Sequence, residues 1–379
     1  MNGRNIGIDA LRIISMLFVV TLHCLGHGGV LENAKGMTYY ASYGLEAAAF
    51  CAVNCFVLIT GYCSCRSTIR AKRITSLWVQ ALFYSVAIVA CLAMLHSDLL
   101  ADKHIPSAFT PVLSNQWWFF TQYFALVFAM PVLNLAISKL EGPDAWKTIF
   151  AIGFVFTIMP LVSQSDLFKL SGGYSFVWFV VLYLTGGALN KLSEAGWHPS
   201  SDRCFAVYIA AVIVTWAPTA LASMHITAIS DICKTLPTLY SYASPTIYLS
   251  SIALFCAFKE TSIKSDRLKK AIEWVAPSVF AVYLISDHRL IRASLITDSF
   301  APFTSAGAAA TLLIVTTSVI GIFVVCVLIE KLRVALFDLI GITALVNRAS
   351  EWIDRLLARA FNAHAHESSA SQAPTQYGS

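Results

Sequence analysis

Residues 8–25 read IDALRIISMLFVVTLHCL, an apolar stretch long enough to cross a lipid bilayer as a helix. Three ionisable residues interrupt it: Asp9, Arg12 and His23. Charged groups within a span are costly and usually face the protein interior, so each is a functional candidate. The stretch is not typical of a cleaved signal peptide, because Asp9 and Arg12 lie where the apolar region of such a peptide would begin. We therefore expect a retained transmembrane helix.

The composition of the whole chain agrees with a membrane protein. Of 379 residues, 57% are hydrophobic and only 12% are charged, whereas a soluble domain has about 25% charged residues. This excludes an ordinary soluble enzyme and a disordered chain, and a net charge of +5 without a dense basic face excludes a nucleic-acid binder. Most cysteines lie in apolar runs, where they pack as small hydrophobes, and Cys63 and Cys65 lack the spacing of a zinc motif.

Ten stretches have the length and composition of a spanning helix. They are residues 8–25, 45–62, 75–95, 117–138, 147–162, 174–191, 204–222, 240–258, 274–291 and 306–329. With the N-terminus in the cytoplasm, 19 of the 26 Lys and Arg residues fall on the cytoplasmic side and six fall outside. By the positive-inside rule, this asymmetry predicts an all-α bundle of about ten transmembrane helices with both termini cytoplasmic.

Three segments are expected along the chain. Residues 1–335 form the ten-span transmembrane domain. Residues 336–363 form an amphipathic surface helix, in which Trp352, Ile353 and Leu356 share a stripe opposite Arg355 and Arg359. Residues 364–379 are rich in Ser, Ala and Gln and are expected to be disordered.

The spacing within the first span points to a site that links the two membrane surfaces. Arg12 and His23 are eleven residues apart, which is three helical turns plus roughly 20°, so they share a face and lie roughly 16 Å apart along the axis. The predicted topology brings further polar and aromatic residues to the level of His23. These are Glu46, Asn115, Gln116, Trp117, Trp118, Asp287 and His288.

Each of these residues also has a structural interpretation. Asp9 and Arg12 are three residues apart and are compatible with an ion pair at the headgroup level. His23 is compatible with an interhelical hydrogen bond, and Trp117 and Trp118 with an aromatic belt rather than a sugar platform. Glu46 is compatible with a solvated position, and Asp287 and His288 with helix-end groups. The pair His23 and His27 has zinc-ligand spacing, but His27 precedes Gly28 and Gly29 beyond the expected helix end, so we predict no metal site.

Several motifs together resemble the acyltransferase-3 family of integral membrane O-acyltransferases. The first is Asp9-Ala-Leu-Arg12 with ten residues between Arg12 and His23. The others are Phe56-Val-Leu-Ile-Thr-Gly61-Tyr62, Lys72-Arg73-Ile74, Trp117-Trp118-Phe119 with Tyr123, Pro131 and Asn134, and Tyr283-Leu-Ile. The chain departs from the family pattern at Thr60, where Ser is usual, and at Ser286, where His is common and His288 follows two residues later.

The resemblance implies an enzyme of the bacterial-type cytoplasmic (inner) membrane, spanning the bilayer many times. It would move an acyl group, usually acetyl from acetyl-CoA as co-substrate, onto a hydroxyl of a surface glycan or lipid-linked sugar. No permanently bound cofactor is implied.

In this interpretation His23 is the general base, with a covalent acyl-imidazole as the second-ranked variant. Asp287 or Glu46 orients the imidazolium, and Arg12, Lys72 and Arg73 contact the phosphates of the acyl-CoA. Asn115 or His288 polarises the thioester oxygen. The remaining candidates for acceptor binding or support are Asp9, Trp117, Trp118 and Tyr123.

Two other classes of function fit an apolar chain with charged residues inside its spans. A transporter or flippase of a glycan or amphipathic molecule is the main alternative, although the sequence has no evident repeated halves. A membrane anchor or sensor is the third, and it leaves the Arg12–His23 spacing unexplained.

Overall fold

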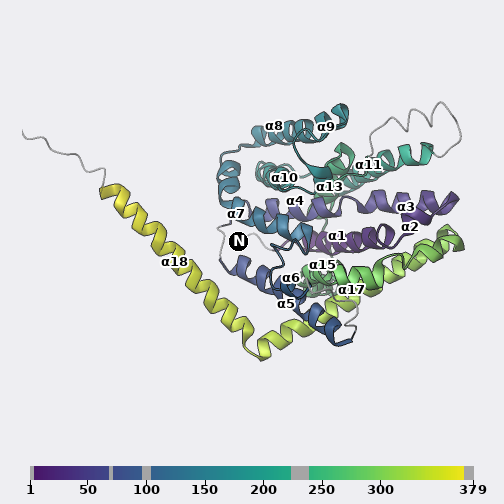
Figure 1. Ribbon diagram of the computed structural model, residues 1–379. Helices are drawn as coiled ribbons and strands as arrows, with labels where there is room; N and C mark the ends of the chain where they lie inside the picture. The colour runs from purple at the N-terminus through teal and green to yellow at the C-terminus, as the bar shows by residue number, and fades with distance from the viewer. Residues whose placement is uncertain (1–3, 68–70, 96–103, 223–238, 371–379) are drawn as a thin grey trace, which may run out of the picture.

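The computed structural model describes residues 4–67, 71–95, 104–222 and 239–370, and these residues contain helices and loops but no strand. The long helices are α1 (Ile6–Leu25), α3 (Gly36–Ala49), α4 (Ala52–Ser64), α5 (Ala71–Leu95), α7 (Trp118–Ser138), α8 (Gly142–Gly153), α10 (Phe176–Glu194), α11 (Ser201–Ala222), α13 (Pro245–Glu260), α14 (Asp266–Val275), α17 (Ala308–Leu339) and α18 (Ile342–Ala370). The short ones are α2 (Val30–Asn33), α6 (His104–Ala108), η2 (Phe154–Ile158), α9 (Met159–Ser163), η3 (Ser171–Gly173), η4 (Ala276–Ser278), α15 (Val279–Ser286), α16 (Arg289–Ile291), η5 (Arg292–Ile296) and η6 (Ala301–Ala306). Most of the long helices run side by side, with α1 in the middle (Figure 1).

The all-α prediction is confirmed, and eight helical segments of the described chain are long and apolar enough to cross a membrane. They correspond to eight of the ten predicted spans. The other two stretches form shorter helices. Residues 240–258 give the 16-residue helix α13, which begins at Pro245. Residues 274–291 are divided among α14, η4, α15 and α16. The break between α14 and α15 falls at Pro277 in η4, which cannot donate the backbone hydrogen bond that a continuous helix needs.

Burial separates an inner layer of helices from an outer one. In the most apolar 18 residues of each segment, the buried share is 72% for α3–α4, 61% for α10 and 56% for α1. For α5, α7, α8–α9, α11 and α17 the share is 28% or less. The outer helices expose large apolar side chains such as Phe128 on α7 and Leu332 on α17. Lipid tails solvate such side chains, so this layer is the bilayer-facing surface of the bundle.

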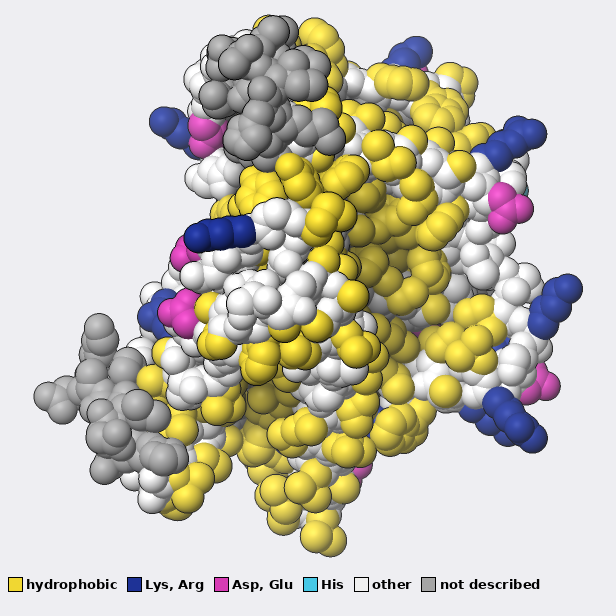
Figure 2. All heavy atoms as spheres, turned by 90° about the vertical axis from the view of Figure 1, so that its right-hand side faces the viewer, with side chains coloured by type: hydrophobic (Ala, Val, Ile, Leu, Met, Phe, Trp, Pro, Cys, Tyr) yellow, Lys and Arg dark blue, Asp and Glu magenta, His cyan; other side chains and the backbone are white. Residues whose placement is uncertain are grey.

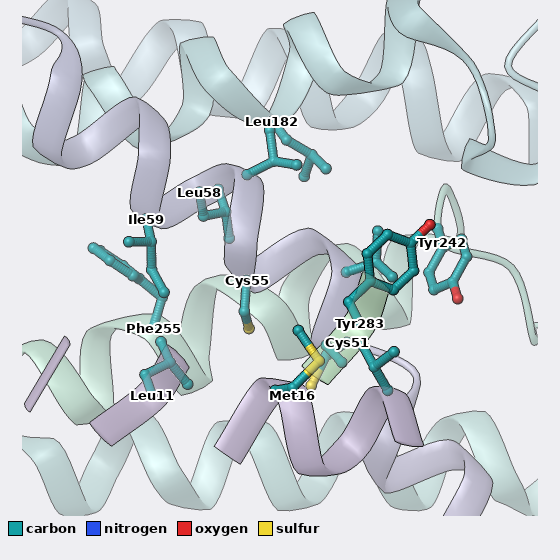
Figure 3. Close-up of a cluster of buried hydrophobic side chains, with 14 of the residues drawn as sticks. Leu11, Met16, Cys51, Cys55, Leu58, Ile59, Leu182, Tyr242, Phe255 and Tyr283 are labelled. Atoms are coloured by element: carbon teal, nitrogen blue, oxygen red, sulfur yellow. The ribbon is translucent and has the colours of Figure 1, made fainter. Parts of the chain in front are cut away.

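Close contact between α4 and α10 shapes the inner layer. A Cβ atom on Gly61 would lie 2.2 Å from the carbonyl oxygen of Tyr183, so only glycine allows this approach. Next to Gly61, the buried side chains Leu58 and Ile59 of α4 join Leu11 of α1 and Phe255 of α13 in the hydrophobic core (Figure 3).

The C-terminal boundaries differ from the sequence prediction. Helix α17 ends at Leu339, and Gly341, whose φ of 78° favours glycine, follows its C-cap Ile340, so residues 336–339 belong to α17 and not to the helix that follows. Helix α18 then runs to Ala370, beyond the predicted end at 363, since residues 358–370 contain several alanines, the strongest helix former. Residues 371–379 of the predicted tail lie outside the described residues.

Helix α18 is tied to the beginning of α5. The backbone N–H of Ala71 donates to Oδ1 of Asp354 at 2.9 Å, and the hydroxyls of Thr75 and Ser350 are 2.5 Å apart. From there α18 diverges from the bundle on the side of the N-terminus (Figure 1). It therefore does not join the packed spans.

Candidate functional site

A cavity of about 230 Å³ runs along one face of α1, between its two ends, and is called here the central cavity. Helix α1 contributes Arg12, Met16, Val19, Leu22 and His23. Four of these, at positions 12, 16, 19 and 23, follow the spacing of a single helical stripe. The other lining residues are Val53, Phe56, Ile59, Thr60, Cys63, Ser64, Arg73, Leu77, Trp118, Phe119, Tyr123, Tyr242, Val279, Phe280 and Tyr283. The structure thus puts Arg12 and His23 on the same cavity wall.

At the α2–α3 end of the central cavity, His23 faces a carboxylate. Nε2 of His23 lies 3.8 Å from Oδ1 of Asp287, which is buried at the end of α15. The same oxygen accepts a hydrogen bond from Nη1 of Arg292 at 2.7 Å. Nδ1 of His23 has no hydrogen-bond partner among the described residues. With the Nε2 proton directed to Asp287, Nδ1 carries the lone pair.

His27 lies one turn beyond His23, with its ring centroid 5.7 Å from that of His23. Partial burial, together with the positive charges that His23 and Arg292 can carry, lowers the pKa of His27. His27 does not line the central cavity.

At the other end of the central cavity, a guanidinium is fixed by hydroxyl groups. Arg73 donates from Nη1 to Oγ of Ser64 at 2.8 Å and from Nη2 to the Tyr123 hydroxyl at 2.6 Å. The hydroxyl of Thr60, at 3.3 Å from that of Tyr123, continues this network. The hydroxyl of Thr60 therefore belongs to the network that holds the Arg73 guanidinium.

A second cavity, called here the basic vestibule, adjoins the first at this end. It has a volume of about 590 Å³ and is lined by Arg4, Asn5, Ile8, Asp9, Arg12, Tyr62, Cys63, Arg66 and Asn190. Arg12 and Cys63 line both cavities. The buried carboxylate of Asp9 pairs with both Arg4 and Arg12, and Arg66 pairs with Glu194. The vestibule therefore offers three guanidinium groups at the mouth of a mostly apolar cavity.

Other predicted site residues lie away from the walls of the central cavity. Lys72 is exposed on α5, next to Arg73 but outside the lining. Glu46 is half-buried on α3, and its Oε2 has no hydrogen-bond partner among the described residues. Asn115 has a φ of 46° and is exposed, and its carbonyl oxygen accepts from Arg289 at 2.6 Å.

Trp117 and His288 are buried and do not line the central cavity. Their ring centroids are 5.7 Å apart, and Nδ1 of His288 accepts from the backbone N–H of Leu290 at 3.3 Å. Trp118, in contrast, lines the central cavity together with Tyr242 and Tyr283. Tyr242 and Tyr283 lie on the same side of the core cluster in Figure 3.

Sequence reasoning missed Arg292, Tyr242, Cys63 and Arg66. The positions 60, 63 and 64 have the i, i+3, i+4 spacing of one helix face, which could have placed Cys63 beside Thr60. No sequence signal links Tyr242 to the site, because its position is set by contacts with residues far away in the sequence, such as Asn54 and Tyr174.

Residues 5–331 match a family model described as an acyltransferase domain, the acyltransferase-3 model. No curated protein and no solved structure matches the chain.

Proposed function

The chain belongs to the acyltransferase-3 family, whose model covers residues 5–331, and we propose that it transfers an acetyl group from acetyl-CoA to a hydroxyl of a surface glycan or lipid-linked sugar. The family and the apolar helices support a multi-pass membrane acyltransferase. The observation that carries the finer proposal is the central cavity, which has Arg12 and Arg73 at one end and His23 beside Asp287 at the other.

The donor enters, in this proposal, from the end at which α1 begins. Most Lys and Arg residues fall on that side in the predicted topology, which makes it the cytoplasmic side. The guanidinium groups of Arg4, Arg12 and Arg66 suit the phosphates of coenzyme A, since guanidinium binds phosphate through paired hydrogen bonds. The narrow, mostly apolar central cavity suits the pantetheine arm, which carries the thioester toward His23.

The reaction follows from the position of the imidazole. Nδ1 of His23 takes the proton of the acceptor hydroxyl while the hydroxyl oxygen attacks the carbonyl carbon of the thioester. The tetrahedral intermediate then collapses, the C–S bond breaks, and the imidazolium gives its proton to the leaving thiolate. Asp287 stabilises the imidazolium through its 3.8 Å approach to Nε2, as a carboxylate does in a catalytic triad.

The test uses membranes that contain the wild type, His23→Ala or His27→Ala, supplied with acetyl-CoA labelled in the acetyl group. We expect label in glycan or glycolipid with the wild type and His27→Ala, and none with His23→Ala. His27→Ala is the matched control, because it removes a neighbouring imidazole that does not line the cavity.

Two results would count against the proposal. If His23→Ala transferred label at the wild-type rate, His23 would not be the general base. If the wild type transferred no label from acetyl-CoA to any acceptor, water included, a transporter or flippase would become the better interpretation.

A further inference from the structure

Three aromatic side chains connect the central cavity to the protein surface and are called here the aromatic trio: Trp118, Tyr174 and Tyr242. Ring centroids are 4.4 Å apart for Trp118 and Tyr174, 5.2 Å for Tyr174 and Tyr242, and 6.0 Å for Trp118 and Tyr242. Trp118 and Tyr242 line the central cavity with His23, whereas Tyr174 is 48% exposed. The trio therefore forms a continuous aromatic wall from the outside to the cavity.

The trio lies at the end of the bundle opposite the basic vestibule. Trp118 opens α7, Tyr174 precedes α10 and Tyr242 precedes α13, and these helices all run from the α2–α3 end. Figure 2 views the molecule from this end and shows hydrophobic side chains around a depression in the middle of the face. A second substrate can thus approach without passing the donor.

Buried contacts fix the shape of the trio. Nδ2 of Asn54, fully buried on α4, donates to the carbonyl oxygen of Tyr242 at 2.9 Å, and Oδ1 of Asn54 accepts from Trp178 Nε1 at 3.0 Å. Gly173, with a φ of 98°, would place a Cβ 2.4 Å from Cβ of Tyr242. The loops that carry Tyr174 and Tyr242 are therefore packed against each other and against α4, so the aromatic wall is preorganised.

We propose that the aromatic trio binds a sugar ring of the acceptor and delivers its hydroxyl to His23. A pyranose ring presents an apolar C–H face and polar edges, and Trp and Tyr combine an apolar ring with a polar group in the same way. Aromatic residues of a membrane-interface belt lie at the level of the lipid headgroups. The trio differs, because its rings come from three separate segments, pack on one another and open into the cavity.

This inference rests on the proposed acetyl transfer, and the test separates the two. Membranes are supplied with labelled acetyl-CoA and with de-acetylated oligosaccharides cut from the surface polysaccharide of the cells that express the chain. We expect Tyr174→Ala to raise KM for the oligosaccharide about tenfold, because one aromatic contact with the sugar is lost. The KM for acetyl-CoA should stay unchanged. Tyr174→Phe keeps the ring and should stay close to the wild type.

The matched control is Phe176→Ala, which removes another exposed aromatic ring two residues away that does not line the central cavity. An unchanged KM for the oligosaccharide in Tyr174→Ala, or an equal rise in Phe176→Ala, would overturn the acceptor site while leaving acetyl transfer intact. The unchanged KM for acetyl-CoA shows that Tyr174→Ala is folded. If the wild type transferred no label, the proposed function itself would fail, and the inference with it.

Discussion

His23 on α1 and Asp287 at the end of α15 approach within 3.8 Å, measured from Nε2 to Oδ1, at one end of the central cavity. Arg292 holds the same carboxylate oxygen at 2.7 Å. The carboxylate is therefore fixed in place before any substrate binds. In the proposed mechanism it offsets the positive charge that develops on the imidazole.

Replacing Asp287 by Asn removes the charge and keeps the shape. We expect kcat to fall roughly 10²–10⁴-fold, because the imidazolium loses its partner, while KM for acetyl-CoA changes little. Steady-state kinetics with labelled acetyl-CoA measures both. A kcat at the wild-type level would mean that the 3.8 Å contact has no part in the reaction.

Arg73→Lys tests the donor end of the cavity. A lysine cannot keep both hydrogen bonds to Ser64 and Tyr123 in the geometry of the guanidinium. We expect KM for acetyl-CoA to rise about tenfold, because this is the effect of losing one charged hydrogen bond. Arg203→Lys, at an exposed arginine at the beginning of α11, is the control and should leave KM unchanged. Equal effects of the two changes would argue against a donor site at Arg73.

Cys63 provides a natural reporter of the donor path, because it lines both cavities. In a Cys91→Ser, Cys204→Ser, Cys233→Ser background, which removes the half-exposed Cys204 as well, we expect a membrane-impermeant maleimide to label Cys63 in inverted vesicles but not in right-side-out ones. Desulfo-coenzyme A, which lacks the thiol that would itself consume the maleimide, should slow the labelling several-fold by occupying the cavity. Cys63→Ser in the same background gives the unlabelled baseline. Labelling from the outside only would reverse the proposed orientation, and labelling that desulfo-coenzyme A does not slow would exclude this donor path.

Gly61→Ala tests the packing that shapes the cavity. The added Cβ would meet the Tyr183 carbonyl oxygen at 2.2 Å, and such overpacking costs about 1–3 kcal/mol. We expect a lower Tm for the detergent-solubilised protein. Gly321→Ala on α17 is the control, since a Cβ there meets no atom within 4 Å, and alanine favours a helix. A Tm unchanged by Gly61→Ala would mean that α4 and α10 separate at little cost.

Much of the architecture follows from local properties of the sequence. Length and apolar composition predict the spanning helices, and the eleven-residue spacing predicts that Arg12 and His23 share a face of α1. Both depend only on helix geometry and on the cost of leaving polar groups in lipid. Helix ends were less predictable: at Pro277 an apolar stretch breaks, and at Gly341 a positive φ separates α17 from α18.

Only the tertiary structure decided which of the polar residues at each level meet. Asp287 and Glu46 are equivalent in the sequence, since each is a carboxylate at the same predicted depth. The packing of α15 against α1 brings Asp287 to His23 and leaves Glu46 outside the cavity lining. Tyr242 joins the site because buried Asn54 holds its backbone. The sequence by itself determined which face of α1 is polar, because helical periodicity is local. The partners of that face were decided by contacts between distant segments, which depend on how the side chains of several helices pack together.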